Sequence, residues 1–225
     1  LSLDHKEADR VPIDFGGRHT GLHTYTHRAL KQHLGYEGGE ENIGNWMLML
    51  ADTDPRLLRR FDASVTSVLA QSPDSWQFHI DEETNTWQDE WGVTYYMPPD
   101  GYYYDIYRSP LSEADSAEVL AYRYPDPSDQ GRVRGLADKI RKLREESDRA
   151  ILICAPTGGV WEHNQWLLGI EHAYIELALN PGLLENLAAR NAEWQAAYWE
   201  HVLREVGDLV DVVQIGDDLG GQNGP

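Results

Sequence analysis

Short apolar runs alternate with longer amphipathic stretches along most of this chain. Residues 10–15 and 150–157 are apolar runs followed by paired glycines, a pattern typical of buried strands. The β-branched segment 62–70 and the apolar segment 211–218 predict two further strands. Apolar positions at helical spacing predict the helices of the chain, at residues 21–34, 43–61, 131–147, 161–178 and 180–207.

Strands separated by helices favour parallel pairing, because a parallel connection has to cross from one end of the sheet to the other. We therefore expect a single α/β domain, either a (β/α) barrel or an open sheet. Residues 75–108 differ, since they are rich in Trp and Tyr and carry turn signals at 83–85 and 98–101. That segment predicts an inserted antiparallel β-hairpin or a small antiparallel sheet.

The charge of the chain limits its partners. Its 225 residues include 38 acidic and 19 basic side chains, a formal net charge of −19. Such a field repels phosphate backbones and anionic lipid surfaces, so we expect no nucleic-acid partner and no membrane partner. The single cysteine, Cys154, excludes an intramolecular disulfide and fits a reducing cytoplasm, where we expect the protein to be.

Several segments follow one another in the order found in a known enzyme family. They are EADRVPIDFGGRHTGLHTYTHRALKQHLG, DSWQFHID, TWQDEWGVTYY, RYPDPSDQGRVRGL, GGVWEHNQWLLGIEHAYIELALNPGLLENL and DVVQIGDDLGGQNGP. Together they resemble the uroporphyrinogen decarboxylase superfamily, and most closely its branch of cobamide-dependent methyltransferases. The most characteristic parts are Asp89-Glu90-Trp91-Gly92 and the strand end Asp217-Asp218-Leu219-Gly220.

The resemblance implies a fold. Residues 1–225 are expected to form one domain of the (β/α)8 TIM-barrel type. Members of the family are longer, so by resemblance this chain is truncated after about two thirds of the barrel. An incomplete barrel exposes open strand edges and an apolar face. A homodimer that covers both is a hypothesis, which the mass in solution would test.

The resemblance also implies two alternative activities. The decarboxylase branch, which serves porphyrin synthesis, binds a polyanion, but the matching loop at residues 15–19 offers only one cation, Arg18. Leu69 aligns with an aspartate of those decarboxylases. The methyltransferase branch uses zinc to activate a thiol, which accepts a methyl group from a corrinoid such as cobalamin. The family's zinc ligands have no counterpart in this chain.

We therefore expect a methyltransferase-like protein that acts on a small molecule or a corrinoid protein and transfers a methyl group to a thiol. Without the zinc ligands this chain is expected to be inactive by itself. The alternatives are a decarboxylase relative and a non-catalytic binding subunit.

The acidic pair Asp217 and Asp218 is the strongest candidate for catalysis. Both end an apolar strand, and the C-terminal strand ends form the active-site face of a TIM barrel. Because adjacent strand residues point to opposite sides, only one of the two can face the barrel axis, and the other is expected to support a loop or a helix N-terminus. The alternative is that both cap the following turn. Gln222, close by in sequence, is a candidate polar group of the pocket.

Basic and aromatic residues complete the candidate site. Arg18, His19 and His23 follow the first predicted strand, and Trp161 and His163 follow the strand at 150–157. In a barrel these five residues would share one face, with the first three and Trp161 binding substrate. His163 is a candidate for proton transfer, because an unperturbed histidine has a pKa near 6.5.

Two further patterns have competing interpretations. His19, His23 and His27 are spaced four residues apart, but Gly16 and Gly17 delay the helix, and a His pair on a helix surface is commoner than a metal site. No metal site is therefore predicted. A second pattern is aromatic and consists of Trp76, Trp87, Trp91, Tyr95 and Tyr103. It predicts a flat pocket for a corrin ring or an aromatic methyl donor, or else packing of the hairpin, with Asp89 and Glu90 holding it by hydrogen bonds.

Overall fold

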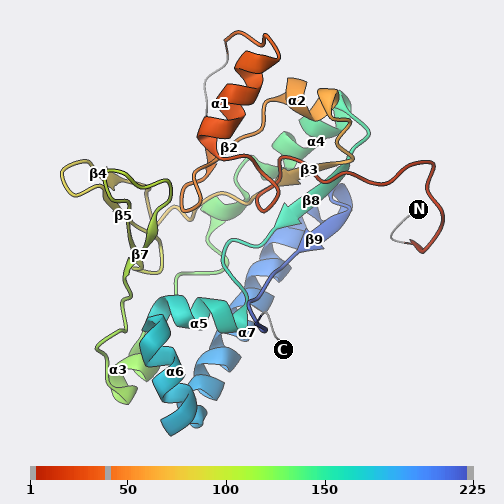
Figure 1. The fold of residues 1–225 in the computed structure, drawn as a ribbon. Coiled ribbons are helices and arrows are strands. Elements are labelled where there is room, and N and C mark those ends of the chain that lie inside the picture. The colour runs from red at the N-terminus through yellow and green to blue at the C-terminus, as the bar shows by residue number, and fades with distance from the viewer. Residues whose placement is uncertain (1–3, 39–41, 222–225) are drawn as a thin grey trace.

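The computed structural model describes residues 4–38 and 42–221. A three-stranded parallel sheet lies near the middle of the molecule, with a four-stranded antiparallel sheet to one side and helices above and below (Figure 1). The parallel strands are β3 (Val65–Val68), β8 (Ala150–Cys154) and β9 (Val212–Gln214), in that order. The central strand β8 is almost entirely buried, as its apolar sequence predicts.

The sheet corrects the prediction of a (β/α)8 barrel. A barrel closes only when its first and last strands pair. Here β8 lies between β3 and β9, and within residues 4–38 and 42–221 no strand pairs with the other edge of β9. The predicted strand at 10–15 forms no ladder, although Ile13 O accepts a hydrogen bond of 2.7 Å from Ser64 N, next to β3. The described chain therefore builds an open sheet.

Residues 80–108 form a small sheet of four antiparallel strands, which is the second of the two predicted alternatives. Trp87 and Tyr95 are directly opposite each other and stack with ring centroids 4.2 Å apart. Such cross-strand aromatic pairs stabilise a sheet. The strands pair in chain order and are β4 (Ile80–Asp81), β5 (Thr86–Gln88), β6 (Thr94–Tyr96) and β7 (Asp105–Arg108).

The helix predicted for residues 43–61 is wrong over most of its length. Residues 43–51 form a small antiparallel pair, β1 (Ile43–Asn45) and β2 (Leu50–Ala51). Only α2 (Pro55–Arg60) is helical, with Asp54 as its N-cap and Pro55 in the first turn, as predicted. The apolar residues of 43–51 pack against the neighbouring core, and this tertiary packing overrides their helical spacing.

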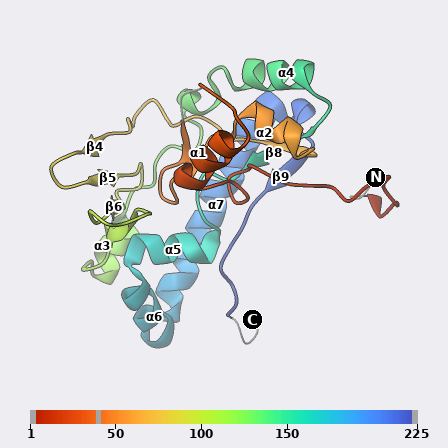
Figure 2. The same ribbon diagram turned by 45° about the horizontal axis from the view of Figure 1, so that its top comes forward.

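The helix predicted for residues 161–178 is two helices. Gly169 has a φ of +82°, which ends α5 (Val160–Leu168) and begins α6 (Ile170–Leu179). Helix α7 (Pro181–Val206) packs against both and extends from them to the parallel sheet (Figure 2). The other helices are α1 (Thr24–His33), α3 (Ser116–Ala121), α4 (Leu136–Glu146) and the 3₁₀ turns Gln130–Val133 and Gly207–Leu209.

One buried cluster joins these elements. It contains Val68 and Ile153 of the parallel sheet, Tyr95 of the antiparallel sheet and Leu187 and Val202 of α7. Because both sheets contribute to it, the space between them has a fixed shape. Among the described residues, no helix has both the length and the apolar character needed to cross a membrane.

Candidate functional site

A cavity of about 560 Å³ lies between the two sheets, at the carboxyl ends of β3 and β8. Residues 69–72, after β3, and 156–157, after β8, form one side of it. Strand ends of this kind are the usual position of ligand sites in parallel sheets. The volume lies within the range of about 300–1,000 Å³ that is typical of small-molecule pockets.

Aromatic side chains make up much of the cavity wall. Trp46 and Phe78 have ring centroids 4.7 Å apart, and Phe78 and Trp87 lie at 5.5 Å. A further flat ring can pack on the exposed faces or edges of such a group of rings. The aromatic residues that line the cavity are Trp46, Trp76, Phe78, Trp87, Trp91, Tyr95 and Trp166.

Arg18 brings a positive charge to this cavity. The loop before it turns at Gly16, whose φ is +86° and where an added Cβ would lie 2.5 Å from Thr53 Oγ1. The Arg18 guanidinium donates a hydrogen bond of 3.3 Å to Pro156 O. No carboxylate within residues 4–38 and 42–221 forms an ion pair with it. Burial lowers the pKa of Arg18, but a guanidinium stays charged, and its remaining donors are available to a ligand.

Asp89 lines the same cavity and is held in one position by three hydrogen bonds. Its Oδ1 accepts from the backbone N–H groups of Trp91 and Val93, each at 2.9 Å. Its Oδ2 accepts from the hydroxyl of Tyr95 at 3.0 Å. Burial raises the pKa of Asp89 to about 6, although these hydrogen bonds act in the opposite direction.

Glu90, next in sequence, is neutralised by a buried ion pair. Arg132 donates to both of its carboxylate oxygens and, through Nε, to Asp126 O at 3.0 Å. The Arg132 side chain is 1% exposed and lies over the ring of Trp194, 5.3 Å from its centroid. Such a bidentate pair fixes the cavity wall beside Asp89. The predicted role of Asp89 and Glu90 in holding this segment agrees with these contacts.

Asp217 supports a helix instead of lining this cavity. Its Oδ2 accepts from Trp161 N at 2.9 Å and its Oδ1 from Glu162 N at 2.8 Å. These N–H groups belong to the first turn of α5, which has no side-chain cap of its own. The predicted support of a helix N-terminus by one residue of the acidic pair is therefore found for Asp217, which lies in the segment that follows β9.

Replacing Asp217 by Ala is expected to lower the free energy of unfolding by about 1–2 kcal/mol, because two backbone donors of α5 lose their partner. Urea denaturation would measure the loss. Asp218→Ala is the matched control, since the Asp218 side chain is exposed and none of its oxygens accepts a hydrogen bond in the described structure. Equal losses in both variants would contradict the capping role.

Trp161 and Asp218 lie at a second hollow, away from the aromatic cavity. Tyr174, Leu177 and Leu219 also line it, and the Trp161 and Tyr174 rings meet edge to face at 5.7 Å. The structure thus does not bring these two predicted site residues together with Arg18. Gln222 lies outside the described residues.

His163 is a core residue. Its side chain is fully buried, and its ring lies 4.2 Å from that of Trp91, behind the cavity wall. Neither ring nitrogen has a hydrogen-bond partner in the described structure. Burial lowers the pKa of His163 to about 3, so the ring is neutral near pH 7. The candidate role in proton transfer had assumed an unperturbed pKa near 6.5. Trp91, 3% exposed, both packs in the core and lines the cavity.

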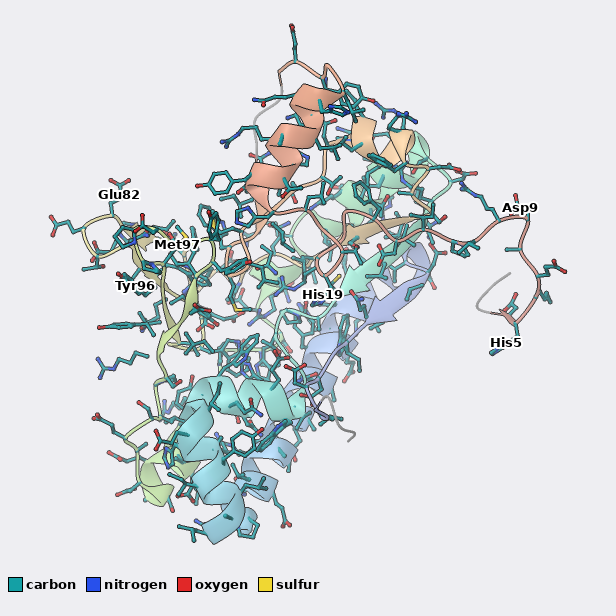
Figure 3. The ribbon with its side chains drawn as sticks, in the orientation of Figure 1. His5, Asp9, His19, Glu82, Tyr96 and Met97 are labelled. Atoms are coloured by element: carbon teal, nitrogen blue, oxygen red, sulfur yellow. The ribbon has the colours of Figure 1, made fainter. Side chains whose placement is uncertain are left out.

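The three histidines near the N-terminus have separate structural positions. His19 is exposed and lies near the middle of the molecule, away from Tyr96 and Met97 of the antiparallel sheet (Figure 3). His23 caps α1 by accepting from Tyr25 N, and its Nε2 lies 2.8 Å from Tyr102 O. His27 is buried and its Nε2 accepts from Asp54 N at 3.1 Å. They do not converge on one point.

The residues present do not fit a zinc site. Within residues 4–38 and 42–221, no three His, Cys, Asp or Glu side chains are placed to share a metal ion. Cys154 is buried, its thiol donates to Gln214 Oε1 at 3.3 Å, and burial raises the pKa of the thiol. A buried thiol of this kind is a poor ligand, because zinc binds the thiolate.

Sequence reasoning placed Tyr95 among the aromatic residues of a predicted flat pocket, but it gave Asp89 only a structural role. Both lie in the segment Asp89-Glu90-Trp91-Gly92-Val93-Thr94-Tyr95, whose first part had been recognised as characteristic. An Asp followed two residues later by Trp and Gly signals a turn, and a turn is compatible with a structural role alone. The position of the turn beside the parallel strand ends was not visible in the sequence.

The chain matches no protein-family model, no curated protein and no solved structure. Inferences about its function therefore rest on the site and on the predicted resemblance.

Proposed function

We propose that the aromatic cavity binds the small-molecule substrate of a corrinoid-linked methyl transfer, in which a thiol accepts the methyl group. The observation that carries the proposal is the cavity at the strand ends, walled by seven aromatic side chains and holding Arg18. Of the two ligands that the sequence left open, the volume of about 560 Å³ favours an aromatic methyl donor, because a corrin ring with its side chains is larger.

The charges in the cavity disfavour the decarboxylase alternative. Arg18 and Lys139 are the cations among its lining residues, whereas Asp52, Asp89 and Glu90 are carboxylates. A polyanionic tetrapyrrole would face as many negative groups as positive ones or more. A mono-anionic aromatic molecule suits this balance better, with its ring on the aromatic wall and its charge toward Arg18.

In this proposal the residues of the chain bind and orient the substrate. Among the described residues no three His, Cys, Asp or Glu side chains are placed to bind zinc together. The proposal therefore includes no step that needs the metal. The protein is proposed to act in the cytoplasm, where a buried free thiol such as Cys154 stays reduced.

Binding is tested with benzoate, followed by quenching of tryptophan fluorescence. Phe78→Ala is expected to weaken benzoate binding roughly fivefold, the equivalent of about 1 kcal/mol for a lost ring contact. Phe61→Ala is a matched control, because Phe61 and Phe78 are both 38% exposed and only Phe78 lines the cavity. Cyclohexanecarboxylate, which has no aromatic ring, should bind more weakly than benzoate. Equal affinities for both ligands and all variants would contradict the site.

The reaction is tested by incubating the chain with methylcobalamin and a small thiol, and separately with uroporphyrinogen. Formation of the methyl thioether supports the proposal and would contradict the expectation that the chain is inactive without the zinc ligands. Consumption of uroporphyrinogen without thioether formation would favour the decarboxylase alternative over the proposed methyl transfer. Neither product, together with a tight complex with another subunit, would favour a non-catalytic binding subunit.

A further inference from the structure

The two carboxyl oxygens of Asp89 have different surroundings. Oδ1 accepts from Trp91 N and Val93 N, and these two bonds close the turn between β5 and β6. Oδ2 takes no part in that turn and has one partner, the hydroxyl of Tyr95. A turn alone needs only Oδ1. Since Asp89 and Tyr95 both line the cavity, Oδ2 is left for a role toward a ligand.

We infer that Asp89 and Tyr95 form a proton-donating pair in the cavity wall and, together with Arg18, bind the oxyanion of an aromatic ligand. The inference rests on the proposed function, because it concerns the same cavity and names the class of molecule that enters it. All three residues line this cavity, and the hydroxyl of Tyr95 donates a hydrogen bond to Asp89 Oδ2.

The charges around the cavity explain why an oxyanion fits. The Arg18 guanidinium is fixed by Pro156 O and has no carboxylate partner among the described residues. The carboxylate of Glu90 is occupied by Arg132. A protonated Asp89 therefore adds a donor next to an unpaired cation, whereas an ionised Asp89 would repel the ligand.

Two tyrosines and Glu90 are titratable groups close to Asp89. Tyr95 faces it from β6, and Tyr122, after α3, donates a hydrogen bond to Trp91 O. Burial raises the pKa of both tyrosines, so both stay neutral. Glu90 is adjacent and is ion-paired with Arg132. Burial raises the pKa of Asp89 to about 6, so its carboxyl gains a proton just below neutral pH.

Benzoate binding measured from pH 5.5 to 8 tests the inference. If only protonated Asp89 binds benzoate, the dissociation constant rises roughly 50-fold between pH 6 and pH 8. Benzyl alcohol is the control ligand, because it has the ring without the anion and should show little dependence on pH. The probe itself stays ionised throughout this range, so the change reports the protein.

Two variants assign the effect to the pair. Asp89→Asn keeps the two backbone hydrogen bonds at Oδ1 and carries a permanent donor, so its benzoate affinity should vary less than twofold over the same range. In Tyr95→Phe the transition should move to higher pH, because the hydroxyl of Tyr95 stabilises the ionised carboxylate of Asp89. If Tyr95 only shaped the cavity wall, the pH midpoint of benzoate binding would be the same in Tyr95→Phe as in the wild type.

The outcomes separate this inference from the proposed function. Benzoate binding that is independent of pH in the wild-type chain, or a transition that persists in Asp89→Asn, would overturn the inference and leave the aromatic cavity standing. Absence of benzoate and benzyl alcohol binding at every pH would overturn both. Should Asp89→Asn fail to fold, the wild-type profile and Tyr95→Phe decide the matter.

Discussion

Replacing Arg132 by Met is expected to lower the free energy of unfolding by about 3–5 kcal/mol. The variant keeps the length of the apolar stem but leaves the carboxylate of Glu90, whose side chain is 13% exposed, without its partner. Most of the loss comes from this unpaired charge, since removing one member of a buried pair costs more than the pair itself contributes. Urea denaturation at pH 7 would measure it.

Two controls show whether the buried charge is the cause. The double variant Glu90→Leu with Arg132→Met removes both charges and should regain most of the stability. Arg204→Met breaks the exposed pair between Arg204 and Glu200, whose side chains are 71% and 73% exposed, and should change little. A double variant as unstable as Arg132→Met would show instead that the shape of the arginine side chain matters.

Asp89 is expected to make the stability of the protein fall as the pH rises from about 4 to 7. The pKa of Asp89 is about 6 in the folded chain, compared with the ordinary value of 3.8 that applies to the unfolded chain. The folded state therefore binds the proton more tightly than the unfolded state. The stabilisation is therefore complete below pH 3.8 and is lost as the pH rises through 6. This difference in pKa corresponds to about 3 kcal/mol.

The wild-type chain and Asp89→Asn should be compared by urea denaturation at several pH values. Because Asn does not titrate, the stability of Asp89→Asn relative to the wild type should increase by about 2.5 kcal/mol between pH 4 and pH 8. Asp54→Asn is a control with the opposite sign, since Arg56 lowers the pKa of Asp54 to about 2. The difference in the free energy of unfolding between Asp54→Asn and the wild type should stay constant above pH 5. A constant difference for Asp89→Asn would contradict the raised pKa.

Local sequence signals predicted several elements well. The strand within residues 150–157, the helix that begins at Pro181 and the cap at Asp54 are found in the structure. Each depends on neighbours in the chain: an apolar run, a fixed proline φ, or a side chain that reaches the next turn. The antiparallel character of residues 75–108 was also visible, although the number of strands was not.

Predictions that depended on the whole fold were less successful. The barrel was wrong because alternation of strands and helices does not state whether a sheet closes. Asp217 and Asp218 were assigned to catalysis from their position at a strand end, but the Asp217 carboxylate caps α5. His163 was placed at a pocket, yet packing against Trp91 buries it completely.

The sequence by itself determined the local elements, the aromatic character of the inserted segment and the acidic charge of the chain. Only the tertiary structure decided which side chains share the cavity, because Arg18, Asp89 and Pro156 come from segments far apart in sequence. It also decided the protonation of Asp89 and His163, since a pKa depends on burial and on neighbours in space. The spacing of residues along the chain gives no information about which side chains share the cavity or about their protonation.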